Sequence, residues 1–306
     1  MNISCGHIGY YYEKTTLMDI NILACAIINI VKTPPTIFLN LFIILTSDHR
    51  KMKTTTTGCL LANLVIADLL MGCFVSPCAA AEFLMIYLGK DPCFLSNFTT
   101  PVSLIIGVVS VITLAILAID SYMLFCHPFK HQRLQCQTLI YTVLITIWAL
   151  PLYPTLESTL NEDMITFDAF VVFLSALVFP VYGFCYGNIY KLIRRHKRQI
   201  QEVTSNHRLS CTANRDKNSV ICAAMLLTST ILCLCPAAVL SSLSAVTSRR
   251  NKRLIGYLTY WAWTLATLNS LINPIFKFYR LENVRSAFKK FWKRGRRLSA
   301  ATPEMD

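Results

Sequence analysis

The rest of this chain is interpreted from one stretch, Leu268-Asn-Ser-Leu-Ile-Asn-Pro-Ile-Phe-Lys277. It places polar residues just ahead of a proline inside a long apolar run. Proline has no amide hydrogen, so Pro274 leaves the carbonyl one turn earlier without its helical partner. Polar groups inside a lipid-embedded helix must be satisfied within the protein. The face that carries Asn269 and Asn273 is therefore expected to look into a helix bundle, toward Asp68 of a second apolar run.

The composition is that of an integral membrane protein. Of the 306 residues, 54% are hydrophobic and only 15% are charged, which is unlike a soluble domain. Seven runs of roughly 20 mostly apolar residues predict an all-α membrane protein, a seven-transmembrane helix bundle. The runs cover residues 20–47, 58–86, 97–125, 136–154, 168–192, 219–246 and 254–278.

The chain divides into four predicted parts. Residues 1–19 form an extracellular segment, 20–278 the bundle, 279–295 a short amphipathic helix on the membrane surface, and 296–306 a disordered cytoplasmic tail. No cleavable signal peptide is evident, so the first run is expected to direct its own insertion.

Positive charges set the orientation. Of the 29 Lys and Arg residues, 21 lie in four segments that are therefore expected to face the cytoplasm. The N-terminus then lies outside the plasma membrane, where Asn2, in the sequon Asn-Ile-Ser, is an expected glycosylation site. Anionic inner-leaflet lipid is sufficient to explain the net charge of +13, and no nucleic-acid partner is needed. The four segments are 46–58, 126–136, 190–218 and 279–306.

The reactive residues give no catalytic or metal site. Most of the 13 cysteines lie in apolar runs, where a free cysteine acts as a small hydrophobe. Cys5 and Cys93 lie in outer segments, and a bridge between them is one alternative. The sequence has no metal-ligand spacing, phosphate-binding glycine loop or nucleophile with a matching base, so no enzyme activity is expected.

Almost every apolar run carries a characteristic residue, and the set as a whole points to a family. A single proline in a membrane helix would be ordinary. The set consists of Asn40, Asn63 with Asp68, Asp120 with Tyr122, Trp148, Pro180, Pro236, and Asn273 with Pro274. In this order, over about residues 20–295, it resembles the rhodopsin-like (class A) G-protein-coupled receptors. The resemblance implies a cell-surface receptor that transduces an unknown extracellular ligand to heterotrimeric G proteins.

Three positions depart from the activation motifs of that family. Ser121 replaces the arginine of Asp-Arg-Tyr, Leu234 the tryptophan of Cys-Trp-x-Pro, and Lys277 the tyrosine of Asn-Pro-x-x-Tyr. The acid that the arginine would meet is retained as Asp216. These changes leave a second function open, namely a non-signalling decoy or a heteromer partner of another receptor. A transporter or channel is less favoured, because no internal repeat is seen.

The resemblance also implies an allosteric sodium site. Five residues match the positions that hold the ion in the family: Asp68, Ser110, Asn269, Ser270 and Asn273. The alternative is a neutral, hydrogen-bonded Asp68 that holds the first, second and seventh runs together through Asn40.

The candidate ligand pocket consists of Lys32, Glu82, Ser103, Leu234 and Trp263. Because Ser103 stands where amine receptors carry aspartate, a biogenic amine is not expected as the ligand. Lys32 is expected either to face the bundle or to extend toward the membrane surface. The basic outer loop 248–253 indicates either pairing with the acidic loop that precedes the fifth run or an anionic ligand.

Two further predictions concern the cytoplasmic side. Lys277 either pairs with Asp216 or Asp120 and keeps this side closed, or extends to lipid phosphate. Ser299, in Arg-Arg-Leu-Ser, resembles a kinase site whose phosphorylation would weaken contact with the inner leaflet. An unmodified tail is the alternative.

Overall fold

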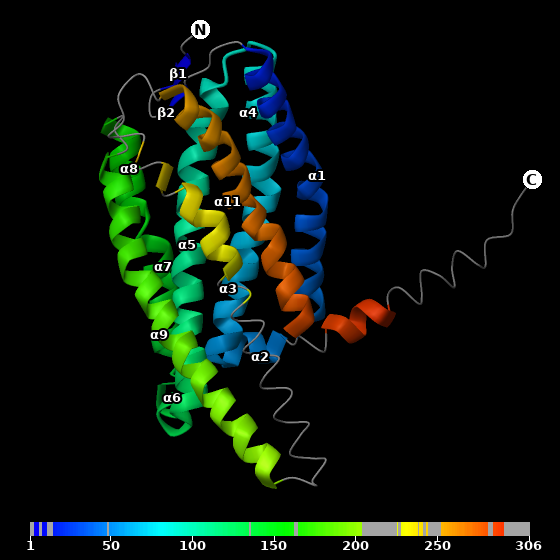
Figure 1. The fold of residues 1–306 in the computed structure, drawn as a ribbon, viewed down its shortest axis with the longest axis vertical. Coiled ribbons are helices and arrows are strands. Elements are labelled where there is room, and N and C mark those ends of the chain that lie inside the picture. The colour runs from blue at the N-terminus through cyan, green and yellow to red at the C-terminus, as the bar shows by residue number, and fades with distance from the viewer. Residues whose placement is uncertain are drawn as a thin grey trace, which may run out of the picture.

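The computed structural model describes residues 3–5, 8–10, 15–47, 49–134, 136–161, 165–203, 225, 228–237, 239–240, 243, 252–280 and 284–290. Long helices lie side by side in a bundle, with the N-terminal hairpin at one end and short helices at the other (Figure 1). The long elements are α1 (Thr16–Thr46), α3 (Thr56–Leu70) continued by η1 (Met71–Val75) and α4 (Ser76–Tyr87), α5 (Cys93–Cys126), α7 (Gln137–Ala149) followed by α8 (Leu152–Asn161), α9 (Ile165–Val203) and α11 (Lys252–Arg280). The short ones are α2 (His49–Thr54) and α6 (Pro128–Leu134).

The described helices account for the predicted spans. Five helical segments are long and apolar enough to cross a membrane, judged over the residues that the structure describes. A shorter apolar helix, Thr228–Ala237, lies within the sixth predicted run, and α11 covers the seventh. The predicted all-α membrane architecture is confirmed. Large apolar side chains such as Ile30, Phe38 and Ile145 remain exposed on the outside of the bundle, as lipid-facing residues do.

The N-terminal segment contains a hairpin that the sequence did not predict. Strand β1 (Ile3–Cys5) pairs antiparallel with β2 (Ile8–Tyr10). Strand β1, which ends at Cys5, packs against α5, which begins at Cys93, and Cys93 is disulfide-bonded. The arrangement agrees with the alternative of a bridge between the two outer cysteines.

Helix α1 continues without a break through two consecutive prolines, Pro34 and Pro35. Threonine hydroxyls lie beside the two prolines and bond to backbone carbonyls of the same helix. Thr33 donates to the Asn29 carbonyl and Thr36 to the Lys32 carbonyl, each at 2.7 Å. Such side-chain bonds, with packing against neighbouring helices, allow proline inside a membrane helix.

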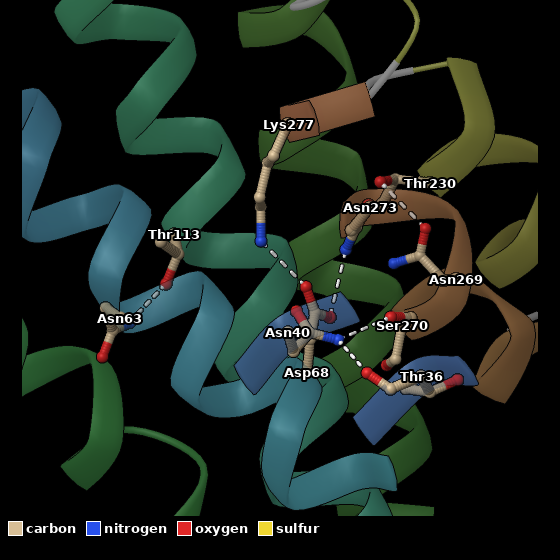
Figure 2. A network of polar contacts seen from close by, with 10 residues as sticks. All are labelled: Thr36, Asn40, Asn63, Asp68, Thr113, Thr230, Asn269, Ser270, Asn273 and Lys277. Carbon is tan, nitrogen blue, oxygen red and sulfur yellow. Dashed lines mark hydrogen bonds and ion pairs between the residues drawn. The ribbon is translucent and has the colours of Figure 1, made fainter. Parts of the chain in front are cut away.

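The second span contains a turn of π-helix, η1, directly after α3. Gly72 in this turn lies against α1, and a β-carbon built on it would be 2.9 Å from Cγ2 of Thr36. A side chain at position 72 would therefore push α1 away. Together α3 and η1 bring Asp68 into the middle of the bundle, facing α11 (Figure 2).

The helix at 284–290 packs against the bundle with its apolar side. Val284 is fully buried among Ile43 and Val65, and the Phe288 ring meets the rings of Phe42 and Phe278 edge-on, with centroids 5.7 and 5.1 Å apart. The predicted amphipathic helix is therefore present, but these two apolar residues contact α1, α3 and α11 rather than only the membrane.

Candidate functional site

The centre of the bundle holds a buried ion pair between α3 and α11. Asp68 is 0% exposed and Lys277 1%. The Lys277 ammonium donates to Oδ2 of Asp68 at 3.0 Å, and the Asn273 amide donates to Oδ1 at 3.1 Å (Figure 2). Asn273 and Lys277 are four residues apart and so lie on one face of α11. Both oxygens of the carboxylate are thus occupied from the same helix.

Asn40 of α1 satisfies the backbone carbonyl that Pro274 leaves without a helical donor. The carbonyl of Ser270 lies four residues before Pro274 and accepts from the Asn40 amide at 3.2 Å. The same amide nitrogen donates to the Thr36 carbonyl of its own helix at 2.9 Å. The proline defect in α11 is therefore repaired from α1, which joins these two helices beside Asp68.

The five residues predicted to surround sodium are all buried and gather around the same region. The side-chain oxygen of Asn269 accepts from the Thr230 hydroxyl at 3.4 Å. The Oδ1 atoms of Asn40 and Asn273 are buried acceptors with no hydrogen-bond partner among the described residues. The polar set is assembled as expected, but the positive charge bonded to its carboxylate belongs to Lys277.

Lys277 occupies neither of the positions predicted for it. It bonds to Asp68, whereas Asp120 has other partners, and its burial excludes contact with lipid phosphate. The physical reason is side-chain direction: a helical side chain points back toward the N-terminus of its helix. On α11 that direction leads away from the C-terminal end of the helix and toward Asn273. The i, i+4 spacing of Asn273 and Lys277 was the available signal in the sequence.

Asp120 binds partners that the sequence did not reveal. Nε2 of His131, on α6, lies 2.8 Å from Oδ1 of Asp120, and the Thr57 hydroxyl donates to Oδ2. Asp120 and His131 are 7% and 5% exposed. No sequence pattern singled out these partners, because each comes from a different short segment that only the fold brings to the end of α5.

The two residues that follow Asp120 at the C-terminal end of α5, Ser121 and Tyr122, are uncharged. Ser121 is buried and donates to the carbonyl of Leu117 in its own helix at 2.8 Å. Tyr122 packs against the rings of His127 and Phe184. Where the family pattern has an arginine, this chain therefore has a short side chain turned onto its own helix.

A second polar network ties the second, third and fourth spans together. The Trp148 indole donates to Oδ1 of Asn63, and the Asn63 amide donates to the Thr113 hydroxyl, both at 2.8 Å. Pro180 lies in α9 and Pro236 in the helix at 228–237. These residues serve the architecture of the bundle.

A cavity of about 150 Å³ lies above the polar core between α5, α9, α11 and the helix at 228–237. Ser103, Leu234 and Trp263 line it, as predicted, and its lower part reaches Ser110 and Asn269. Its lining residues, all in the described part of the chain, include no Asp or Glu.

Glu82 and Lys32, also predicted for the pocket, lie beside the cavity. Glu82 lines a smaller adjacent space of about 30 Å³, which shares Ser103, Trp263 and Thr267 with the main cavity. Lys32 faces the bundle at 3% exposure, and its ammonium donates to the Thr267 hydroxyl. The predictions at Asn2, Asp216 and Ser299 lie outside the described residues.

A bundle of membrane-length helices with a buried carboxylate core and an internal cavity is the architecture of a multi-pass membrane protein. The profile of the 7 transmembrane receptor (rhodopsin family) matches residues 39–159. Over this stretch the chain is similar to a family of receptors, and its bundle of long apolar helices agrees with the seven-helix fold of that family.

Curated relatives show the same similarity. Trace amine-associated receptor 1 of Mus musculus is 29% identical over 115 residues, 37% of this chain and 33% of the relative. Trace amine-associated receptor 3 of Mus musculus is 24% identical over 207 residues, 60% of each chain. Rhodopsin of Neoniphon argenteus is 25% identical over 201 residues, 57% of this chain and 56% of the relative. The chain therefore spans less than two thirds of the length of each of these relatives.

Proposed function

We propose that this chain is a plasma-membrane receptor that binds a small extracellular ligand in the main cavity and passes the signal to heterotrimeric G proteins. The cavity carries the proposal, because it lies between α5, α9, α11 and the helix at 228–237 and reaches the polar core beneath it. The charge distribution of the sequence supports an N-terminus outside the cell.

The size and lining of the cavity favour a small, mainly apolar ligand. A cavity of about 150 Å³ matches one that holds a single benzene-sized molecule. Hydroxyl groups such as those of Ser103, Ser175 and Thr267 provide polar contacts in a mainly apolar lining. A protonated amine would find no carboxylate in this lining, so the amines in the names of the relatives do not carry over to this chain.

Lys32 favours a ligand with an acidic group. Its ammonium is buried at the level of the cavity, and its hydrogen bond goes to Thr267, a neutral hydroxyl that lines the cavity. A charged lysine inside the bilayer costs about 3 kcal/mol on insertion scales. A ligand carboxylate at Thr267 would offset part of that cost. The expected class is therefore a small aromatic or aliphatic carboxylic acid.

The test is the melting temperature of the purified receptor with benzoate, with short-chain fatty acids and with the corresponding amines. Acids should raise it, and Lys32→Met should abolish the rise. Lys90→Met, an exposed lysine outside the helices, serves as the control and should keep it. Stabilisation by the amines instead of the acids would contradict the proposed ligand class.

Ser121 favours a second candidate function, the decoy or heteromer partner. With its hydroxyl turned onto its own helix, the cytoplasmic end of α5 lacks the family's arginine. Nucleotide exchange on G proteins, measured with the native chain and with Ser121→Arg, separates the two candidates. Exchange driven by the native chain supports the signalling receptor, and exchange driven by Ser121→Arg alone supports the decoy.

Anionic inner-leaflet lipid is proposed as a further partner. Lys289 and Lys290 are exposed on the helix at 284–290, while its apolar residues hold that helix against the bundle. Basic side chains near the inner surface attract anionic headgroups. Phosphorylation of Ser299 would oppose this attraction, and it stays a prediction.

A further inference from the structure

We infer that Lys277 is the cation of the polar core: its tethered ammonium takes the place that the family resemblance gives to a sodium ion, and it locks α11 to α3. Sodium binding at Asp68 is the competing prediction. The inference concerns the bundle itself and does not depend on the proposed ligand or on G-protein coupling.

The first argument concerns the hydrogen bonds of the Asp68 carboxylate. The Lys277 ammonium lies 3.0 Å from Oδ2 of Asp68, a distance at which a charge-assisted hydrogen bond forms. Oδ1 of the same carboxylate accepts from the Asn273 amide at 3.1 Å. A sodium ion bound to Asp68 would compete with the Lys277 ammonium for the charge of the same carboxylate. As arranged, the residues fit an ammonium group and not a metal ion.

The second argument concerns the net charge of the polar core. The five residues predicted for the sodium site contain one carboxylate, Asp68, and a single ammonium neutralises it. Adding sodium while Lys277 stays buried would leave an uncompensated positive charge inside an apolar bundle, which is costly. Because Lys277 is attached to α11, it cannot leave as a free ion does. Its departure requires the side chain or the helix to move.

The positions of Asp68 and Lys277 determine what their ion pair does in the bundle. Asp68 lies on α3 and Lys277 near the cytoplasmic end of α11, so the pair joins these helices directly (Figure 2). Moving that end of α11 away from α3 would separate two buried charges, and each would be left without its partner. The pair is therefore a lock whose strength is independent of the sodium concentration.

The first experiment measures the melting temperature of the purified native chain in sodium chloride and in choline chloride at equal ionic strength. We expect the same value in both salts. A sodium-specific rise would overturn the inference and support the sodium prediction. This measurement needs no variant, so it cannot be confounded by misfolding.

The second experiment repeats the salt comparison with Lys277→Met, which removes the charge but keeps a long side chain. A sodium-specific rise of about 2 °C or more is expected, because the vacated carboxylate can then take the ion. Lys90→Met is the control and should behave like the native chain. A folded Lys277→Met variant that does not respond to sodium would contradict the inference.

The double variant Asp68→Asn, Lys277→Met covers the case in which Lys277→Met fails to fold. Removing one charge strands the other, whereas removing both leaves a neutral pair. We expect the melting temperature of the double variant to be higher than that of Asp68→Asn. It should also be the same in sodium chloride and in choline chloride. Additive losses from the two changes would mean that the side chains do not act as a pair.

Discussion

Pro274 removes one backbone hydrogen bond from α11, and a side chain on another helix supplies the replacement. The Asn40 amide donates to the Ser270 carbonyl at 3.2 Å, at a site shielded from water and lipid. In this setting an unsatisfied carbonyl has nothing else to bond. A residue on the first span thus determines whether a proline in the seventh is tolerated.

Asn40→Ala should therefore destabilise the bundle. Leaving the Ser270 carbonyl without a donor is expected to cost about 1–3 kcal/mol. The measurement is thermal unfolding in detergent. Asn188→Ala is the matched control: Asn188 is only partly buried, its amide donates to the Phe184 carbonyl of its own helix, and the expected change stays within about 0.5 kcal/mol. Equal effects of the two substitutions would argue against a role for Asn40 in repairing α11.

Single residues also decide what occupies the cytoplasmic end of α5. Asp120 binds His131 and Thr57 instead of a neighbouring arginine. Lys277, which the sequence suggested as a possible partner of Asp120, bonds to Asp68 instead. The changes at Ser121, Leu234 and Lys277 therefore do not act together to replace the missing arginine.

At the scale of elements, the close approach of η1 to α1 depends on Gly72. The space that a β-carbon would need is already filled by Thr36, whose branched side chain is stiff and buried. The π-helical turn presents Gly72 to α1, and α1 in turn carries Asn40. The backbone shape of the second span thus sets how near the first span comes to the polar core.

Gly72→Ala should push α1 and η1 apart and cost about 1–3 kcal/mol through overpacking. Gly187→Ala, on α9, is the control, because a β-carbon there meets nothing within 4 Å. Alanine also has the higher helix propensity, so the control should be neutral or slightly stabilising. Comparing the melting temperatures of the two variants checks the prediction. Gly72→Ala as stable as its control would show that the interface is loose.

At the scale of the whole molecule, the orientation in the membrane rests on where the basic residues lie. The sequon at Asn2 offers a direct check, since glycan is added only on the outer side. A second sequon, at Asn97, starts within α5, and its Thr99 is buried in the bundle at 5% exposure. This second site is therefore expected to stay unmodified.

Treatment with a peptide N-glycosidase should shift the electrophoretic mobility of the chain made in eukaryotic cells. Asn2→Gln should abolish the shift and Asn97→Gln should leave it unchanged. A native chain whose mobility does not change would count against an extracellular N-terminus. A shift lost with Asn97→Gln would instead place the glycan on α5.

The sequence by itself determined the architecture and the contents of the core. Long apolar runs leave few structures open in a bilayer other than packed helices, and polar residues within them must meet one another. Pro274 predicted an unpaired carbonyl in α11, because proline has no amide hydrogen. Helical spacing predicted that Asn269 and Asn273 face Asp68. These inferences rest on local chemistry that holds in any fold of such helices.

Only the tertiary structure decided which partners those polar groups take. The sequence suggested Asp216, Asp120 or lipid phosphate as the partner of Lys277 and missed Asp68, because the periodicity of a helix gives the direction of a side chain but not the axial offset between two helices. Packing fixed that offset, through the π-helical turn at Gly72 and the contact of α1 with α11, and it set Lys277 level with Asp68. The cavity likewise depends on the spaces that remain between packed helices, which no single segment of the sequence contains.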